Sequence, residues 1–313
     1  MKYFIAGGAG FIGSTLVHKL LKREPDAKIV IYDNLSNGRL KYITDLNSNP
    51  NVEFVLGDIK DLKYLTIAMR DCDVVYHFAS NADISKAMTD PTIDFWEGTY
   101  LTQNILEAMR INGIKKIIYA SGSGVYGDYG YVRIPENTHF KPVTSTYGAS
   151  KLAGESLMYA YSNMFDIEVR TYRFANVVGG NQTHGIVSDL IDKLIKNPNE
   201  LHVLGNGEQL KSYVYVDDIL EGIFLTQNIG KKIEIYNISY ETSVSVKEIV
   251  EIVLEEAGVK GLTIVEYGDT PGGWKGDIPV VLLDSFKIKQ AGWQPKYSSK
   301  EAIRKTAREI LEK

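Results

Sequence analysis

A glycine-rich segment near the N-terminus limits the possible folds of this 313-residue chain more than any other feature. Residues Gly7–Gly13 (GGAGFIG) follow a short apolar run, Tyr3 to Ala6, and lead into the helical spacing of Phe11 to Leu21. In a strand–turn–helix unit, such glycines permit a tight turn and let backbone N–H groups approach a pyrophosphate at the helix N-terminus. The segment therefore predicts an opening βα unit that binds a dinucleotide.

A dinucleotide-binding unit also needs an acidic residue about 20 residues farther on, at the end of the second strand. Asp33 stands there, directly after the apolar run Ile29 to Tyr32. Its carboxylate would accept hydrogen bonds from the adenosine ribose hydroxyls and would repel a 2′-phosphate. The sequence therefore favours NAD over NADP as the cofactor.

The first half of the chain alternates strand-like and helix-like segments. After the first strand, apolar β-branched runs occur at Ile29–Tyr32, Val52–Leu56, Val74–Phe78 and Ile117–Ala120. Continuous runs of this kind are typical of a parallel sheet that is covered on both faces, and parallel crossovers are nearly always right-handed. We therefore predict an α/β fold with a doubly wound, Rossmann-like parallel sheet.

The pattern changes after Asn176, where shorter strand and helix candidates follow and a helix is expected over Ser299–Leu311. We predict an NAD-binding domain over residues 1–175. A smaller α/β domain over residues 176–313 would bind the substrate, with some of its segments returning to the first domain. No low-complexity tract or flexible linker separates the two, because ordinary globular composition continues throughout.

Composition narrows the class of partner. Thirty-five basic and 39 acidic residues leave a net charge of −4, which gives no overall attraction to nucleic acid or anionic membranes. The single cysteine, Cys72, excludes an intrachain disulfide, and the histidines form no H-E-x-x-H pair, so we expect no metal site. No signal-peptide pattern or membrane-spanning apolar run is present. These features predict a cytoplasmic protein that acts on small molecules, with no nucleic-acid or membrane partner.

A second motif, YGASK, places Tyr147 and Lys151 four residues apart at the start of a predicted helix, so both lie on one helix face. A free tyrosine has a pKa of about 10 and is a poor base at neutral pH, but a neighbouring ammonium favours the phenolate. The motif predicts Tyr147 as a general base whose pKa Lys151 lowers. Ser121–Ser123 ends a predicted strand, where ligands bind in open α/β sheets.

Together these motifs resemble the extended short-chain dehydrogenases/reductases, and among them the UDP-glucose (UDP-galactose) 4-epimerases. The similarity extends over nearly the whole chain. The matching segments are Gly7–Gly13, Asp33–Gly38, Gly57–Ile59, His77–Ala79, Tyr119–Gly127, Ser145–Lys151, Arg173–Asn176, Gly205–Asp218, Gly276–Pro279 and Gly292–Pro295. The resemblance implies an NAD-dependent isomerase that interconverts UDP-hexoses through a 4-keto intermediate. It also implies tightly bound NAD and a homodimer.

The resemblance also assigns site residues. The implied NAD contacts are Gly7, Gly10, Phe11, Ile12, Gly13, Asp33, Asn34, Leu35, Ser36, Asn37, Gly38, Asp58, Ile59, Phe78, Ala79, Ser80, Tyr147 and Lys151. The implied substrate contacts are Ser121, Gly122, Ser123, Asn176, Ile186, Val187, Lys211 and Trp274. Lys211 stands where the family usually has an arginine on the diphosphate, so the charge is kept and the bidentate fork is lost.

One departure from the family pattern concerns the catalytic hydroxyl. The family usually has Ser or Thr four residues before the tyrosine of its V-Y-G motif, here Tyr126, and this chain has Gly122 there. Ser121 and Ser123 flank the gap, and we predict that Ser123 is a partial catalytic stand-in.

Three alternatives stay open. Val281, a small residue at a position that limits the sugar pocket in the family, would admit N-acetylated sugars and so a UDP-GlcNAc 4-epimerase. A sugar-nucleotide 4,6-dehydratase needs an Asp-Glu pair where this chain has Ser123-Gly124. The third alternative is a non-catalytic NAD-binding sensor. Gly122 supports it, and the intact Tyr147 and Lys151 pair argues against it.

Overall fold

The computed structural model describes residues 1–313 and divides into two compact units. The first unit comprises residues 1–121, 149–172 and 227–235, and the second comprises residues 122–148, 173–226 and 236–313. Each unit is thus built from segments that are far apart in the sequence. No helix is both long enough and apolar enough to cross a membrane.

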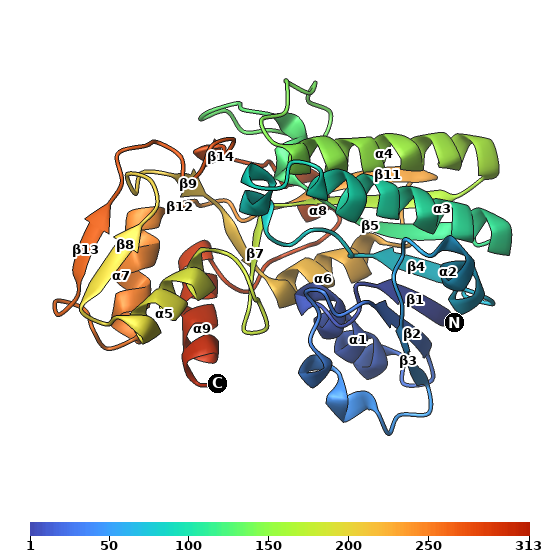
Figure 1. Cartoon of the computed structure of the whole chain (residues 1–313). Helices are drawn as coiled ribbons and strands as arrows, with labels where there is room; N and C mark the ends of the chain where they lie inside the picture. Colours follow the sequence, from blue (N-terminus) through green and yellow to red (C-terminus); the bar gives the residue numbers. More distant parts are fainter. The chain divides into compact units, whose positions relative to one another are not determined.

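The central sheet has seven strands, and it confirms the predicted doubly wound, Rossmann-like α/β fold (Figure 1). Its order is β11-β6-β5-β4-β1-β2-β3. The strands are β1 (Lys2–Ala6), β2 (Lys28–Asp33), β3 (Val52–Leu56), β4 (Val74–His77), β5 (Lys116–Gly122), β6 (Glu168–Phe174) and β11 (Ile233–Ile238). β1 pairs in parallel with β2 on one side and with β4 on the other, so the strand order reverses between β1 and β4. Ligands bind at such a reversal, beyond the carboxyl ends of the strands.

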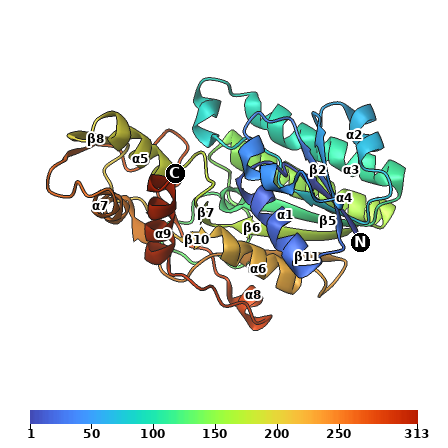
Figure 2. The same ribbon diagram turned by 90° about the horizontal axis from the view of Figure 1, so that it is seen from below.

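Helices cover both faces of this sheet. They are α1 (Phe11–Arg23), α2 (Leu62–Ala68), α3 (Tyr100–Asn112) and α4 (Thr146–Phe165). α1 lies on one face and α3 and α4 lie on the other, and α1 is in front when the molecule is seen from below (Figures 1 and 2). Phe4 and Val75 of the sheet join Leu106 of α3 and Met158 of α4 in one buried apolar cluster. Burial on both faces explains why the strands are continuous apolar runs.

The helix α3 does not begin with a regular helical turn. A π-helical turn, η4 (Phe95–Thr99), precedes α3. A Cβ built on Gly98 in this turn would lie 2.1 Å from Ser150 Oγ of α4, so a larger residue here would require the Ser150 side chain to move. Hydrophobic periodicity carries no signal for such a contact. The remaining short turns are η1 (Leu40–Tyr42), η2 (Thr44–Leu46), η3 (Ile84–Met88) and η5 (Ser123–Tyr126).

The second unit contains small sheets with helices packed beside them. Its strand pairs are β7 (Asn176–Val178) with β10 (Tyr213–Tyr215), and β8 (Glu200–Val203) with β13 (Ile264–Tyr267). A third sheet joins β12 (Val244–Ser245), β9 (Leu210–Lys211) and β14 (Val280–Val281). The remaining helices are α5 (Ile186–Lys196), α6 (Val216–Thr226), α7 (Val246–Glu256), α8 (Phe286–Gln290) and α9 (Ser299–Leu311).

Buried polar contacts fix α9, the predicted final helix, against β10. The Ser299 hydroxyl accepts a hydrogen bond from Tyr213 N–H (3.0 Å) and donates to Tyr213 O (2.9 Å). At the helix start, Ser298 and Glu301 form a reciprocal capping box. The observed bounds of α9 equal the predicted ones.

Candidate functional site

The glycine turn after β1 leaves no space for side chains. Gly7 has φ +78°, and a Cβ there would lie 2.7 Å from Ala79 N. A Cβ on Gly13 would lie 2.2 Å from Gly7 O, because the first turn of α1 packs directly on the loop. No side chain caps α1, and its first turn carries no acidic residue. The free backbone N–H groups of a helix N-terminus therefore face a position suited to an anion.

The sheet order β4-β1-β2-β3 brings four predicted cofactor segments together at one edge. Each segment follows the carboxyl end of one strand. They are Gly7–Gly13 after β1, Asp33–Gly38 at the end of β2, Asp58–Ile59 after β3 and Phe78–Ser80 after β4. The predicted residues are thus neighbours in space, although up to 73 positions separate Gly7 from Ser80.

Asp33 ties two of these loops together. It is 7% exposed, its Oδ2 accepts from Ala9 N–H (3.0 Å), and its Oδ1 accepts from Leu35 N–H (2.8 Å). Burial raises the pKa of this carboxyl, and the two backbone hydrogen bonds oppose that rise. Gly38 lies so close that a Cβ there would be 2.6 Å from Asp33 Oδ1. The carboxylate thus organises the two loops through their backbone.

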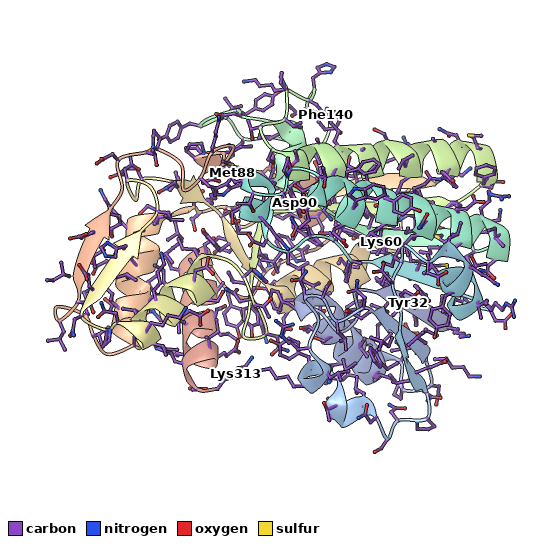
Figure 3. The ribbon with its side chains drawn as sticks, in the orientation of Figure 1. Tyr32, Lys60, Met88, Asp90, Phe140 and Lys313 are labelled. Carbon is purple, nitrogen blue, oxygen red and sulfur yellow. The ribbon has the colours of Figure 1, made fainter.

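Hydrogen bonds also order the loop after β3. Asp58 Oδ2 accepts from Asn34 Nδ2 (3.1 Å) and its Oδ1 accepts from Lys60 N–H (2.8 Å). The Tyr32 hydroxyl donates to Asp58 O (3.0 Å), and Lys60 Nζ pairs with Glu97; Tyr32 and Lys60 are labelled in Figure 3. The side-chain amide of Asn34 therefore links the loops after β2 and β3.

These observations fit an NAD molecule. The glycine turn can cradle a pyrophosphate. The same turn packs against Ala79 and presents only backbone atoms to an approaching ligand. Asp33 ends β2, where the dinucleotide pattern predicts the ribose contact, and Ile59 is buried beside the Asp58 loop. The chemistry of this edge of the first unit is therefore that of a dinucleotide site.

Lys151 lies in the buried interior of the first unit. It is 5% exposed, its Nζ donates to Ala120 O (2.8 Å), and it lies 5.2 Å from the centroid of the Tyr119 ring. Burial lowers the pKa of this ammonium to about 8, although the charges of Asp94 and Glu155 raise it. A lysine with a pKa near working pH is suited to tuning a neighbouring acid.

The phenol of Tyr147, in the first turn of α4, lies beside the missing side chain of Gly122. A Cβ built on Gly122 would be 3.9 Å from both the hydroxyl and the Cε1 of Tyr147. Ser121 is already engaged, because its Oγ donates to Glu155 Oε1 (2.6 Å). Ser123 is half-buried in η5 and starts that turn. Of the two flanking serines, Ser123 therefore stays the better candidate for a stand-in.

In the second unit, a carboxylate positions the predicted diphosphate-binding lysine. Lys211 Nζ lies 2.5 Å from Asp277 Oδ1, and Asp277 Oδ2 accepts from Gly273 N–H (3.0 Å). Trp274, which is half-buried in the same loop, accepts from Asp277 N–H through its carbonyl (3.1 Å). Asp277 thus connects Lys211 with the loop that carries Trp274.

The other predicted substrate residues of the second unit differ in exposure. Asn176 is exposed at the start of β7, and its Nδ2 donates to Ser212 O (3.2 Å). Ile186 and Val187 open α5, where Ile186 is half-buried and Val187 is fully buried. The described contacts leave the carboxamide oxygen of Asn176 available as an acceptor, whereas Val187 supports the helix from within.

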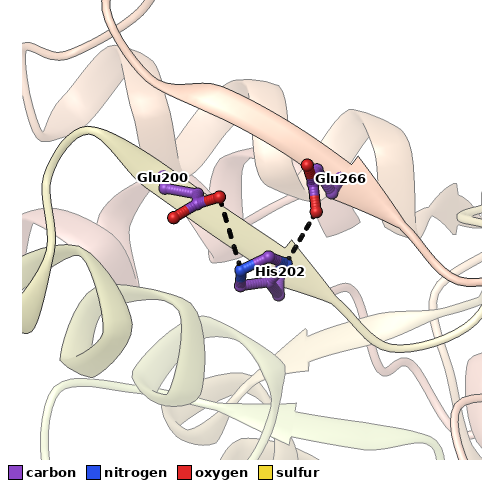
Figure 4. Close-up of side chains that lie close together, drawn as sticks. All are labelled: Glu200, His202 and Glu266. Atoms are coloured by element: carbon purple, nitrogen blue, oxygen red, sulfur yellow. Dashed lines mark ion pairs between the residues drawn. The ribbon is translucent and has the colours of Figure 1, made fainter.

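A cluster of possible metal ligands lies elsewhere in the second unit, on the strands β8 and β13. Glu200, His202 and Glu266 are all exposed, and their ligand atoms lie within 4.8 Å of one another. Glu266 Oε2 is 3.0 Å from His202 Nδ1, whereas Glu200 Oε1 is 3.7 Å from Nε2 (Figure 4). The two carboxylates face different ring nitrogens, and all three side chains are exposed, as is common for acidic groups that hold no ion. The arrangement is that of ion pairs on the surface.

Comparison with known proteins decides the family. A family model described as the NAD dependent epimerase/dehydratase family matches residues 3–239. The chain belongs to this family. A putative UDP-glucose 4-epimerase of Methanocaldococcus jannaschii is 36% identical over 308 residues, which cover 96% of this chain and 95% of that protein.

Solved structures agree with this assignment. The crystal structure of a UDP-galactose 4-epimerase matches with a TM-score of 0.88 at 34% identity, covering 100% of this chain and 99% of the other. A dTDP-glucose 4,6-dehydratase from Streptomyces venezuelae, solved with NAD bound, matches with a TM-score of 0.91 at 26% identity, covering 100% and 97%. The family confirms the predicted NAD cofactor and the predicted class of enzyme, since epimerases are isomerases. The two solved proteins are named for nucleotide sugars.

Three acidic residues of the site were not singled out from the sequence. Glu155 had a signal, because it follows Lys151 by four residues and so shares its helix face. Asp277 lies in the Gly-Asp pair of the family pattern, but its pairing with Lys211 joins positions 66 residues apart. Asp94 had no signal, because only the fold brings it near Lys151.

Buried His77 of β4 predicts a pH-dependent stability. Its Nε2 lies 3.1 Å from Thr102 Oγ1, and burial, aided by the charge of Lys151, lowers its pKa from 6.5 to about 3. Below pH 6.5 the unfolded chain takes up a proton that the folded chain refuses, so the contribution of His77 to stability falls as the pH drops. Between pH 6.5 and 5 we expect a loss of about 2 kcal/mol. Urea unfolding should show a shallower pH dependence for His77→Gln, and equal slopes would contradict this explanation.

Proposed function

We propose that this chain is a nucleotide-sugar 4-epimerase that interconverts UDP-glucose and UDP-galactose through a 4-keto intermediate. The observation that carries the proposal is the pair formed by a buried, charged Lys151 and a tyrosine one helical turn before it in α4. A dinucleotide fold with this pair has the groups for proton removal at a carbinol. The relatives named as 4-epimerases support the same reaction.

Tyr147 acts as the general base in this proposal. Its phenolate removes the proton of the sugar 4′-hydroxyl and later returns a proton to the same oxygen. Lys151 favours the phenolate electrostatically, because an ammonium near a phenol lowers the phenol pKa. NAD, when bound, supplies a hydride acceptor that gives the hydride back, so there is no net redox change.

The second unit holds the nucleotide in this proposal. Lys211 and Asn176 bind the diphosphate, and the ion pair with Asp277 fixes the Lys211 side chain before the substrate arrives. A single ammonium contributes charge without the paired geometry of a guanidinium. Trp274 offers an aromatic face for a base or a sugar. Local charges of this kind let a chain of net charge −4 bind a polyanion.

A 4,6-dehydratase is the second enzymatic candidate, since one of the similar structures has that activity. Elimination needs an acid and a base beside the sugar, and Ser123-Gly124 supply neither. A sensor without catalysis is the non-enzymatic candidate. It has no need of a lysine held at a pKa of about 8 next to a tyrosine. Formation of a 4-keto-6-deoxy sugar would favour the dehydratase, and NAD binding without turnover would favour the sensor.

The preferred sugar depends on Val281, which lies in β14 and is nearly buried. We propose that this small side chain leaves room for an N-acetyl group, so that UDP-GlcNAc is also epimerised. The assay compares UDP-GlcNAc with UDP-galactose. If UDP-galactose is turned over and UDP-GlcNAc is not, Val281 does not set the size of the sugar pocket.

The space beside Gly122 predicts a gain of function. Gly122→Ser fits without a clash, because its backbone is extended (φ −153°) and the new Cβ would be 3.9 Å from the Tyr147 hydroxyl. One added hydrogen bond is worth about 1 kcal/mol, so we expect kcat to rise severalfold and by up to about tenfold. Gly122→Ala, which adds the Cβ without the hydroxyl, is the matched control. An equal change in both variants would exclude the hydroxyl as the cause.

In the wild type, we expect the Ser123 hydroxyl to provide part of the hydrogen bonding that Gly122 cannot provide. Ser123→Ala should lower kcat, whereas Ser123→Ala in the Gly122→Ser background should cost less, because the new hydroxyl takes over. Steady-state kinetics with UDP-galactose measure both. If Ser123→Ala leaves kcat unchanged, Ser123 is no stand-in.

The proposed reaction is tested by anaerobic incubation with UDP-galactose, with UDP-glucose followed by chromatography and bound reduced nicotinamide by absorbance.

The homodimer implied by the resemblance stays a proposal, with α3 and α4 as its helices. Analytical ultracentrifugation of the NAD-loaded protein would show it as a species of twice the chain mass.

A further inference from the structure

The buried ammonium of Lys151 requires compensating charge. Its Nζ donates to the carbonyl of Ala120 (2.8 Å) and lies 5.2 Å from the centroid of the Tyr119 ring, and neither of these groups carries a charge. Removing an ammonium from water is costly unless it is paired. Nearby carboxylates would therefore favour the protonated form of this side chain.

Glu155 is the first such anion. It is fully buried and lies one helical turn after Lys151 on α4, so the two side chains share a face. Both of its oxygens are fixed: Ser121 Oγ donates to Oε1 (2.6 Å), and the Tyr159 hydroxyl donates to Oε2 (3.0 Å). A carboxylate held in this way cannot turn away from the ammonium without losing two hydrogen bonds.

Asp94 is the second anion and comes from another element. It is 1% exposed, it immediately precedes η4, and its Oδ1 accepts from Asn81 Nδ2 (2.9 Å). The same amide of Asn81 donates to Asp83 O (2.8 Å), which fixes its orientation. The charge of Asp94 raises the pKa of Lys151 more than that of Glu155 does, and both oppose the effect of burial.

His77 and Tyr119, which also lie near Lys151, add no positive charge. His77 of β4 is neutral at working pH, because burial and the charge of Lys151 hold its pKa at about 3. Tyr119 of β5 presents its ring. Asp94 and Glu155 are the carboxylates whose charges raise the pKa of Lys151.

We propose that Asp94 and Glu155 are a pair of positioning residues that keep Lys151 protonated and fixed against Ala120. The consequence for Tyr147, which is to favour its phenolate, rests on the proposed function. The protonation state of Lys151 does not rest on the proposed function, and it can be measured without a substrate.

The test is an NMR titration of the NAD-loaded, full-length protein labelled with ¹³C at lysine Cε, with the Lys151 signal assigned by Lys151→Arg. Asp94→Asn and Glu155→Gln are isosteric and change separate elements, so either variant tests the proposal if the other fails to fold. We expect each to lower the titration midpoint of Lys151 by about 1 pH unit, and the double variant to lower it further. Glu155→Asp keeps the negative charge, so its Lys151 midpoint should stay close to that of the wild type.

The matched control is Glu53→Gln, which removes an exposed carboxylate from β3 of the same unit. It should leave the Lys151 midpoint unchanged. In kinetic assays, Asp94→Asn and Glu155→Gln should lower kcat at neutral pH with little change in KM. A wild-type midpoint for Lys151 in both single variants would overturn the proposal, even if activity fell. Inactivity of the wild type toward every nucleotide sugar, with the midpoint shifts intact, would instead overturn the proposed function.

Discussion

Replacing Tyr147 by phenylalanine should lower kcat with UDP-galactose by about 10³-fold and leave NAD bound. The change removes one oxygen, and with it the only group that we propose to exchange a proton with the sugar hydroxyl. General acid–base catalysis contributes roughly 10² to 10⁴ in rate. The glycine turn and Asp33, which we propose hold the cofactor, are untouched. Steady-state kinetics and the nicotinamide content of the purified variant measure the two effects separately.

Tyr131→Phe is the matched control, because this tyrosine is 77% exposed. It should keep wild-type kcat and wild-type NAD content. Substantial epimerase activity in Tyr147→Phe would show that Tyr147 is not the general base. Loss of NAD together with activity would instead indicate that the phenol holds the cofactor.

Gly13→Ala should destabilise the first unit and weaken NAD binding. The added Cβ would lie 2.2 Å from Gly7 O and 2.8 Å from Gly8 Cα, and both contacts are with backbone, which cannot rotate away. Overpacking of this kind costs about 1–3 kcal/mol. Because the displaced turn is the proposed pyrophosphate cradle, we expect NAD affinity to fall by at least about tenfold. Urea unfolding and calorimetric NAD titration give the two values.

Gly10→Ala provides a graded comparison. A Cβ there would lie 3.2 Å from Gly7 O, which a small movement can relieve. Its effect on stability should be clearly smaller than that of Gly13→Ala. Equal effects would show that the steric argument for Gly13 is wrong.

The parallel sheet was predictable because each strand that is covered on both faces is a continuous apolar run, as in Val74–His77. Helix bounds were best where a chemical signal marks them, as at the capping box of Ser298 and Glu301. The π-helical turn at Phe95–Thr99 was not predicted; its Gly98 packs closely on Ser150 of α4, which is distant in the sequence. Local periodicity does not report such tertiary contacts.

At the site, sequence motifs predicted the residues proposed to bind the cofactor or transfer protons. They did not predict the carboxylates that contact those residues. Glycine spacing and the YGASK motif marked Gly13, Tyr147 and Lys151 directly. Asp277 pairs with Lys211, and the charge of Asp94 acts on Lys151; both contacts join positions far apart in the sequence, so the sequence alone does not show them. Their importance appears only after the chain has folded.

The central claim is a C4 epimerisation through a 4-keto sugar. The most direct measurement uses UDP-galactose deuterated at C4, with the product and its label followed by NMR and mass spectrometry. The proposed function predicts UDP-glucose that keeps the deuterium at C4, because the hydride leaves and returns within one enzyme complex. Absence of UDP-glucose, or UDP-glucose that has exchanged the C4 deuterium with water, would contradict it.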